Sequence, residues 1–421
     1  MQLTIHRGSH QIGGSCIEIS SGDTRIILDA GLPLDPDDTS RPNVPGLFGN
    51  DDPKIDALFL SHAHADHAGL IHASKEQVPV YLTEGTNKML LAGGVFARQH
   101  GVPRLRQRPL LPKVPVTIGP LKITAYPVDH SVYDAMAFLV EGDGQRLLYT
   151  GDFRFHGRKP GMMQQLIKVA QRTPLDALVI EGTRLGGRAN EQNLGEADLE
   201  NQIADDLENA PGLVLAMYSP VNVDRFVTYF RAAKKSGRTF VVDPYQALVL
   251  HLIAKQTRVP ELKPESCLRV LIPDKFKTSG PGRMIAGKPW FKKVEVASIS
   301  KAEMLADPTH HLILYRPSMK RGVFGPSLPK QLICLYSYWP GYLEQPDAKV
   351  WISDLKAAEG TLIKRHASGH AHPDNLRSFV EQVDPRMLVP VHTTSAKTWA
   401  KWRPGAIVGC DGHSISIPSK G

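Results

Sequence analysis

The chain has 421 residues, a formal net charge of +8 and a pI near 9.2, with 42% hydrophobic and 22% charged residues. It is too long for one ordinary hydrophobic core, and its composition excludes disordered, collagen-like and cysteine-rich proteins. Four scattered cysteines without CxxC spacing, together with the lack of a long apolar run, favour a cytoplasmic protein and exclude a membrane-spanning one.

Residues 1–195 alternate short strand-like runs with turns. Strands are predicted over LTIHRG, SCIEIS, TRIILDAGL and IDALFLSH, and the last of these leads directly into a histidine-rich stretch. A hairpin is predicted over AFLVEGDGQRLLYTGD, because GDG separates two β-rich runs. Helices are expected over TEGTNKMLLAGGVFARQHG and GMMQQLIKVAQR. This mixture indicates a sheet-containing layered domain.

The pattern changes over residues 196–360. EADLENQIADDLENA predicts an acidic amphipathic helix, and the strand GLVLAMYS and the helix VNVDRFVTYFRAAKKSG follow it. TFVVDPYQALVLHLIAKQ repeats a strand and a helix, so we expect a parallel βαβ domain. Residues 361–421 return to strands and one helix, with histidines reappearing. We therefore expect the middle domain to be inserted into a split first domain.

The stretch SHAHADHAGL, which begins at Ser61, places three histidines and one aspartate within six positions. Burying these groups without partners would cost several kcal/mol, so a packed core does not explain them. His62 and His64 are two residues apart in an extended segment, which directs both rings to one side. Asp66 and His67 follow as the chain turns into a helix. The H-x-H-x-D-H pattern suits two metal ions with nitrogen and oxygen ligands.

Further ligands are expected where other predicted strands end in loops. His130 follows a strand in YPVDHSV, Asp152 follows one in LLYTGDFRF, and His392 follows one in LVPVHTTS. Asp29, in IILDAGL, has the same setting and is expected to orient a ligating histidine. Each residue taken separately is explained equally well as a structural polar group. Together with the opening motif they predict a dinuclear metal site.

SHAHADH, His130, Asp152 and His392, in that order, resemble the metallo-β-lactamase fold. Glu181 in LVIEGTRLG, His370 in HASGHAHPDNL and His392 are similar to the three added motifs of its β-CASP subgroup. HASGH followed by PVH is most similar to ribonuclease J. The resemblance implies an αββα metallo-β-lactamase sandwich over residues 1–195 and 361–421. It also implies an inserted βαβ-type β-CASP domain over residues 196–360, in a short form without the C-terminal domain of longer relatives.

The resemblance further implies two Zn²⁺ ions, with Mn²⁺ or Mg²⁺ as substitutes. His62, His64 and His130 would bind one ion. Asp66, His67 and His392 would bind the other, and Asp152 would bridge the two.

The implied activity is the hydrolysis of RNA, and also of single-stranded DNA, by metal-activated hydroxide, leaving a 5′-phosphate and a 3′-hydroxyl. Asp66 is counted among the catalytic residues, and His370 is expected to act as the general acid with Glu181 as its charge partner. A set of four residues is expected to hold the substrate backbone: His366, Ser368, Ser219 and Arg225. The expected partner is nucleic acid, with no membrane association, and a homodimer is the expected assembly.

The chain differs from the family late in the middle domain, where ICLYSYWPGYLEQP replaces a glycine-rich segment, and at VHTT, where VHGE is usual. Alternative functions therefore remain open. One is a DNA-directed nuclease of repair or defence. Another is a lactone or thioester hydrolase on the same metal core, and a third is a binding subunit without activity. Salt dependence separates polymer binding from ester hydrolysis.

Overall fold

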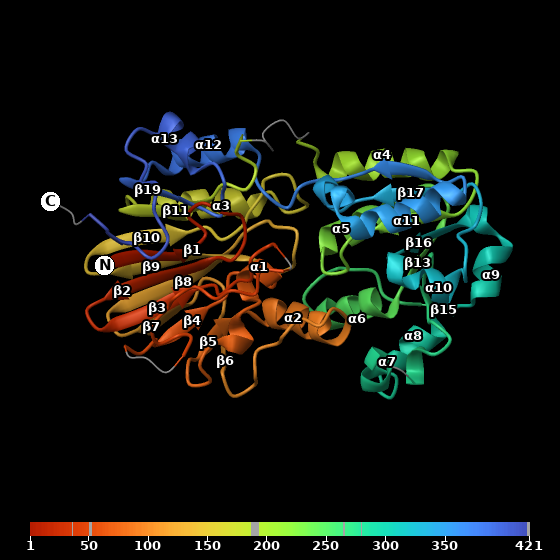
Figure 1. The fold of residues 1–421 in the computed structure, drawn as a ribbon, viewed down its shortest axis with the longest axis horizontal. Coiled ribbons are helices and arrows are strands. Elements are labelled where there is room, and N and C mark those ends of the chain that lie inside the picture. The colour runs from red at the N-terminus through yellow and green to blue at the C-terminus, as the bar shows by residue number, and fades with distance from the viewer. Residues whose placement is uncertain (36, 50–52, 187–192, 264–265, 279, 419–421) are drawn as a thin grey trace. The chain divides into compact units, whose positions relative to one another are not determined.

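The computed structural model describes residues 1–35, 37–49, 53–186, 193–263, 266–278 and 280–418 (Figure 1). The chain divides into two compact units. Unit 1 comprises residues 1–193 and 369–421, and unit 2 comprises residues 194–368. Unit 2 is therefore inserted between the two segments that form unit 1.

The first sheet of unit 1 combines the N-terminal strands with one strand from the end of the chain. In hydrogen-bonded order its strands are β20 (Ser414–Ser416), β1 (Gln2–Arg7), β2 (Cys16–Ser21), β3 (Thr24–Leu28), β4 (Ala57–Phe59), β5 (Val80–Leu82) and β6 (Gln107–Pro109). Burial alternates along β1, where Leu3 and Ile5 point into the core. The strands β3 and β4 are parallel, so both end at the same edge of the sheet.

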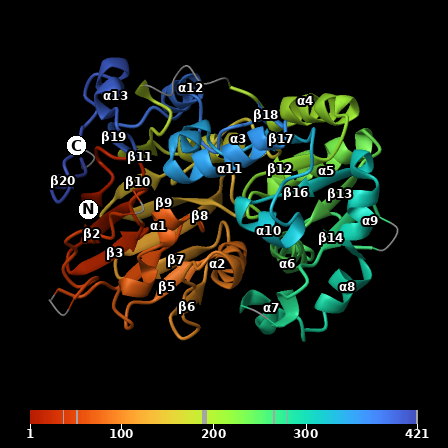
Figure 2. The same cartoon turned by 45° about the vertical axis from the view of Figure 1, so that its right-hand side comes forward.

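The second sheet brings a strand of the return segment beside the first segment. Its strands are β19 (Met387–Val391), β11 (Ala177–Glu181), β10 (Gln145–Tyr149), β9 (Met136–Gly142), β8 (Leu121–Pro127) and β7 (Pro115–Ile118). The predicted hairpin is confirmed, because β9 and β10 pair antiparallel across the GDG turn. The strands β10, β11 and β19 run parallel, and Figure 2 shows the blue return segment beside the earlier strands.

Unit 1 contains two hydrophobic layers. One lies between the two sheets and includes Leu3, Ile123, Phe138 and Val389. The other lies between the second sheet and the helices α3 (Gly161–Gln171), α12 (Pro373–Val383) and α13 (Ala396–Trp402). The helix α3 buries Met163, Leu166, Ile167 and Ala170, the spacing of one helical face, as its sequence predicts. The short α1 (Ala65–Ala68) and α2 (Glu84–Phe96) follow β4 and β5.

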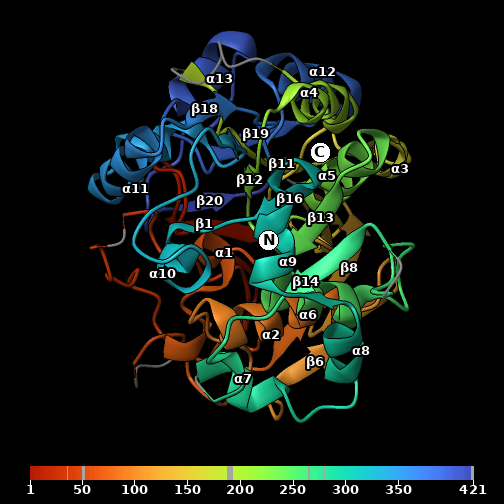
Figure 3. The same cartoon turned by 90° about the vertical axis from the view of Figure 1, so that its right-hand side faces the viewer.

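Unit 2 contains a parallel sheet with helices between its strands, and it includes β18 (Thr361–Lys364), which the sequence analysis assigned to the return segment that begins at residue 361. Its strands, in sheet order, are β15 (Ser298–Ile299), β14 (Leu268–Leu271), β13 (Thr239–Val242), β16 (His311–Leu314), β12 (Val214–Met217), β17 (Ile333–Tyr336) and β18 (Thr361–Lys364). Each neighbouring pair is parallel, and Figure 3 shows β13 beside β16.

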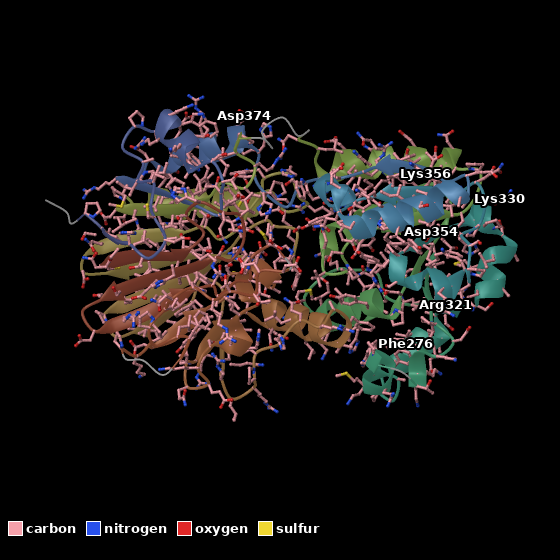
Figure 4. All side chains as sticks on the ribbon, in the orientation of Figure 1. Phe276, Arg321, Lys330, Asp354, Lys356 and Asp374 are labelled. Atoms are coloured by element: carbon pink, nitrogen blue, oxygen red, sulfur yellow. The ribbon has the colours of Figure 1, made fainter. Side chains whose placement is uncertain are left out.

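The helices of unit 2 include three that the sequence predicts: α4 (Glu196–Asn209), α5 (Val223–Lys235) and α6 (Pro244–Ile253). Asn222 and Asp243 cap α5 and α6 at their N-termini, each by accepting a backbone N–H three residues on. Further helices are α7 (Gly280–Ile285), α8 (Phe291–Val296), α9 (Lys301–Ala306), α10 (Lys320–Val323) and α11 (Pro346–Ala357). Asp354 of α11, labelled in Figure 4, lies 2.6 Å from Lys320 Nζ of α10.

Among the helices of the described residues, none is both long and apolar enough to cross a bilayer. The cysteines are unpaired; Cys16 and Cys334 are buried, while Cys410 is exposed.

Candidate metal centre

The strand directions of unit 1 bring the predicted ligands to one end of the sandwich. The strands β8 and β10 each pair antiparallel with β9, so they point the same way, and β11 and β19 run parallel to β10. His130, Asp152 and His392 follow β8, β10 and β19 within three residues, which places them at a common edge. In the other sheet, Asp29 and His62 follow the parallel strands β3 and β4.

The turn that carries Asp66 and His67 is fixed by close backbone contacts with Ser15, which precedes β2, and with the segment after β3. Ser15 N donates to the Asp66 carbonyl at 3.0 Å, and Ala30 N donates to the His67 carbonyl at 2.8 Å. A Cβ at Gly31 would lie 1.7 Å from the Asp66 carbonyl oxygen, so only glycine allows this approach. The backbone of α1 is thereby held against the first sheet.

Three histidines form the first group of ligand atoms. His62 Nε2 lies 3.2 Å from His64 Nδ1, and His130 Nε2 lies 3.1 Å from the same atom. His130 Nδ1 donates to the Gly369 carbonyl at 2.7 Å. Because a carbonyl only accepts, this bond puts the proton on Nδ1 and leaves the Nε2 lone pair directed into the group.

Asp66, His67, Asp152 and His392 form the second group, and their ligand atoms all lie within 4.8 Å of one another. His67 Nε2 lies 3.2 Å from Asp152 Oδ2, and His392 Nε2 lies 3.1 Å from Asp66 Oδ2. His392 has a φ of 52°, a left-handed conformation that costs free energy for a histidine. Its N–H donates to the Gly8 carbonyl at 2.7 Å, which helps to hold that conformation.

Asp152 lies between the two groups. Its Oδ2 is 3.2 Å from His67 Nε2, 3.8 Å from His62 Nε2 and 4.0 Å from His130 Nε2. Within the described part of the chain, both Asp152 oxygens and His67 Nε2 are buried without a hydrogen bond. A buried carboxylate with no donor is costly, and a cation is the partner that this donor set fits. The buried cluster is therefore suited to binding divalent metal.

A hydrogen-bonded network around Asp29 sets the tautomers of two histidines. Asp29 Oδ2 accepts from His67 Nδ1 at 2.8 Å and from the Ser61 hydroxyl at 2.7 Å. Since the Ser61 proton goes to Asp29, Ser61 Oγ accepts from His62 Nδ1 at 2.9 Å. In its neutral form each of these histidines carries its proton on Nδ1 and directs the Nε2 lone pair into the cluster. Tyr149 also donates to Asp29 Oδ2 at 2.8 Å.

Sequence reasoning missed the contributions of Ser61, Tyr149 and Thr183. Thr183 Oγ1 lies 2.8 Å from His392 Nδ1, opposite the nitrogen that faces Asp66. The only available signal was position: Ser61 precedes the motif, and Tyr149 and Thr183 flank the ends of strands that carry Asp152 and Glu181.

The electrostatics of the cluster favour deprotonated ligands, with one exception. Burial lowers the pKa of His62 and of His130 well below the usual range, and neighbouring histidines lower it further. Burial raises the pKa of Asp152, but His392 and His67 outweigh it and hold that pKa well below its usual range. Burial lowers the pKa of His67, yet Asp152 and Asp29 raise it well above 6.5. A metal ion at His67 would compete with a proton for Nε2.

Glu181 and His370 lie at the rim of the same cluster. Glu181 is buried, and its Oε1 is 3.4 Å from His370 Nδ1, while its Oε2 accepts from Thr183 N at 2.8 Å. The His370 side chain keeps 21% of its surface exposed. Burial lowers its pKa, but Glu181 and Asp152 outweigh burial and raise that pKa. His370 Nδ1 also lies 3.7 Å from Asp152 Oδ2, close enough for the ring to join a metal ligand set.

The four predicted substrate-binding residues belong to unit 2. Ser219 follows β12 and is half-buried, and His366 follows β18, with its Nδ1 donating to the Ser337 carbonyl at 3.0 Å. Ser368 is buried.

The expectation for Arg225 is not supported by its position. Its side chain is fully buried and donates to Glu196 and to the carbonyls of Ser337 and Ala367. The guanidinium neutralises a buried carboxylate and caps loops, so it is not available to a substrate phosphate.

Comparison with known proteins agrees with this geometry. A model described as "Beta-lactamase superfamily domain" matches residues 24–203. The chain is 28% identical over 251 residues to an "RNase J-like protein" of Methanocaldococcus jannaschii, and the match covers 56% of each protein. It is 22% identical over 400 residues to "Ribonuclease J2" of Bacillus subtilis, covering 91% of this chain and 68% of that one. The chain thus spans little more than half the length of the first of these relatives.

A solved structure extends the fold comparison to nearly the whole chain. The crystal structure of a protein of unknown function from Enterococcus faecalis V583 has a TM-score of 0.78 at 23% identity, and the match covers 98% of this chain and 99% of that one. The predicted metallo-β-lactamase fold is confirmed. Residues 24–203 match the model of the β-lactamase superfamily domain, and the chain that carries them is similar to ribonuclease J-like proteins.

Proposed function

We propose that the protein is a metal-dependent nuclease that hydrolyses RNA phosphodiesters and leaves a 5′-phosphate and a 3′-hydroxyl. The observation that carries this proposal is the position of Asp152, whose buried oxygens lie between a three-histidine group and a mixed histidine–aspartate group. Two cations sharing one carboxylate is the arrangement that in-line phosphoryl hydrolysis uses.

The proposed ions are two Zn²⁺, with Mn²⁺ or Mg²⁺ as substitutes. The nitrogen-rich donor set supports zinc, because Mg²⁺ prefers oxygen ligands. His62, His64 and His130 would hold one ion, and Asp66, His67 and His392 the other, with Asp152 shared. When bound, such ions lower the pKa of a coordinated water and polarise a phosphoryl oxygen.

His370 and Glu181 supply the proton chemistry in this proposal. The carboxylate of Glu181, 3.4 Å from His370 Nδ1, favours the protonated ring. A protonated and partly exposed ring at the rim of the cluster can donate a proton to the leaving 3′-oxygen. Asp66 fixes His392 by the 3.1 Å contact between them, so its loss would disturb the second group as well as remove a ligand.

RNA is the proposed substrate because two of the similar proteins carry ribonuclease J names and the chain has a net charge of +8. A cytoplasmic location belongs to the proposal, and the unpaired cysteines are compatible with a reducing compartment. The expected homodimer stays a prediction that light scattering would check.

End-labelled RNA and DNA oligonucleotides of one sequence test the proposal. The metal-loaded protein is compared with Asp66→Ala and His370→Ala, and with His413→Ala as a control, since His413 is exposed outside the cluster. We expect RNA cleavage in the parent and the control and at least a 100-fold loss in the other two variants. Cleavage that persists in both would overturn the mechanism, and cleavage of DNA alone would overturn the choice of substrate. Lactone hydrolysis insensitive to salt would instead favour a small-molecule hydrolase.

A further inference from the structure

A second charged feature of unit 1 lies outside the metal cluster. A hollow of about 460 Å³ is formed by the β7–β10 part of the second sheet and the C-terminal end of α3. We call it the α3 groove. Its charged and aromatic lining consists of Lys113, Lys122, Tyr126, Glu141, Arg146 and Arg172.

The groove exists because the helix layer covers only part of the outer face of the second sheet. On β8, Leu121, Ile123 and Ala125 point into the core between the sheets. Residues at alternate positions, including Lys122 and Tyr126, therefore point outward. The helix α3 packs against the outer face through its apolar side. The remaining outer face is polar, and the hollow lies where the helix ends.

The groove carries an excess of positive charge. Four cationic side chains and one carboxylate line it, which leaves a net charge of +3. Glu141 lies 3.0 Å from Lys122 Nζ and 3.4 Å from Arg146 Nε, so one carboxylate serves two cations. Asp176, whose Oδ2 accepts from the backbone N–H of Arg146, is buried and binds Arg386 at 3.2 Å.

Two of the cations have no carboxylate partner among the described residues. Lys113 Nζ donates to the Gln165 side-chain oxygen at 3.1 Å, and Arg172 has no ion pair within the part of the chain that the structure describes. Both residues are exposed. Their charges are therefore available to a ligand, whereas Lys122 and Arg146 already share Glu141.

The groove and the metal cluster are joined by one strand. Tyr126 lies four residues before His130, so the chain between them spans at most ~14 Å, and Lys122 lies within ~29 Å on the same limit. Lys122, Arg146 and Arg172 lie near the starts of β8, β10 and β11, at the sheet edge opposite the cluster, so only an RNA longer than a few nucleotides can occupy both sites. A small-molecule site would be enclosed and mainly apolar, whereas this hollow is lined by four cations, one carboxylate, two threonines and the half-buried Tyr126 ring, with Pro115, Leu139 and Val169 as its apolar part.

We propose that the α3 groove binds the phosphate backbone of single-stranded RNA on the outer face of the second sheet, away from the cleaved bond, with Lys113 and Arg172 contacting phosphates and Tyr126 offering a ring to a base. The inference rests on the proposed function. It assigns a second binding site to a part of the same RNA that flanks the cleaved bond. Cationic grooves with aromatic side chains bind single strands without sequence preference, and such binding weakens steeply as salt rises.

The test compares Lys113→Glu/Arg172→Glu with Lys397→Glu/Lys401→Glu, which makes the same charge change on two exposed lysines of α13. Single-turnover cleavage of a 20-nucleotide RNA, with metal-loaded protein in excess, separates half-saturation from maximal rate. Fluorescence anisotropy with the same RNA measures binding whether or not cleavage occurs. Both are repeated across a salt series, with a tetranucleotide as the short substrate.

For the groove variant we expect the protein concentration at half-saturation to rise about tenfold or more with the 20-mer. The increase should be a larger factor than with the tetranucleotide. The slope of log affinity against log salt should fall by about 1.4, which is 0.7 for each lost contact. The α13 variant should stay within about twofold of the parent. Equal losses in the two variants, or an unchanged 20-mer affinity in the groove variant, would overturn the groove proposal while leaving RNA cleavage intact. Competition by a glutamate oligomer as strong as that by RNA would overturn the choice of RNA. Binding without any cleavage by the parent would instead count against the proposed function alone.

Discussion

Buried charges near the carboxyl ends of the strands are compensated differently in unit 1 and in unit 2. In unit 2, Asp243 follows β13 and binds Arg316, which follows β16, and buried Glu196 binds buried Arg225. In unit 1, Asp152 follows β10 and is surrounded by histidine nitrogens without a hydrogen bond to its oxygens among the described residues. Unit 2 thus balances its charges within the protein, while unit 1 concentrates donors suited to a cation.

This difference shows what separates a structural strand end from a functional one. Burial of a charge is equally costly in both units, so burial alone does not identify a site. The distinguishing feature in unit 1 is the donor type: imidazole nitrogens whose opposite nitrogens are already fixed by Ser61, Asp29 and the Gly369 carbonyl. Such preset tautomers serve a metal and have no use in a simple ion pair.

The largest effect is expected for Asp152→Asn in unit 1. The amide removes the negative charge shared by both ligand groups, so metal affinity should fall by about 3–5 kcal/mol, or about 10²- to 10⁴-fold. RNA cleavage should fall with it. Metal content by mass spectrometry, and the change in melting temperature on adding a chelator, measure this loss. Stoichiometric metal in the variant would show that Asp152 is not shared between ions.

The matching change in unit 2 is Arg225→Met. It leaves Glu196 buried without its cation and should lower the free energy of unfolding by about 3–5 kcal/mol, measured by urea denaturation. The double variant Arg225→Met/Glu196→Leu should recover most of that loss, because no uncompensated charge remains. Failure of the second change to restore stability would mean that the bonds from Arg225 to the Ser337 and Ala367 carbonyls matter more than the ion pair.

A smaller effect is expected for Asp29→Asn, which tests the preset tautomers. Asparagine tolerates the φ of 64° at this position, so the backbone should be kept. Loss of the carboxylate that accepts from His67 and Ser61 should weaken metal binding by about 10–100-fold, measured by competition with a chromogenic chelator. Asp23→Asn, in the exposed turn between β2 and β3, is the matched control and should bind metal like the parent.

The smallest effect is expected at Glu18 of β2. This buried carboxylate of unit 1 is paired with protein side chains, as the buried carboxylates of unit 2 are. Burial raises the pKa of Glu18, but hydrogen bonds from His6 and Arg25 outweigh burial and hold that pKa at about 2. A depressed carboxyl pKa adds stability above pH 4.5, and this stability is lost as the pH falls toward 2. Glu18→Gln should therefore cost about 1–2 kcal/mol at pH 7 and progressively less below pH 4.5. A cost independent of pH in urea titrations would rule out the carboxylate as its source.

The fold was predictable where the hydrophobic pattern was long and regular. The hairpin across GDG, the helix α3 and the strand–helix alternation around β12 and β13 all follow from the sequence. The short helices α7 to α10 carry too few residues for a periodic signal, and the sequence did not predict them.

The site was predictable as far as residue type and strand position specify it. The seven predicted ligands come together because parallel strands end at one edge. The contacts of Thr183 and Tyr149 depend on which face of each strand end meets the cluster, and sequence position alone does not show that. Arg225 illustrates the same limit: a basic residue near a helix start suggests a phosphate contact, but only the packing of α4 against α5 reveals Glu196 as its partner.

The ligand atoms come from residues 62 to 392, and unit 2 lies between the two contributing segments. During synthesis the ribosome must therefore complete the whole inserted unit before His392 emerges to close the second group. A partly made chain lacks His392, so the second group of ligand atoms cannot be completed until nearly the whole chain has been synthesised.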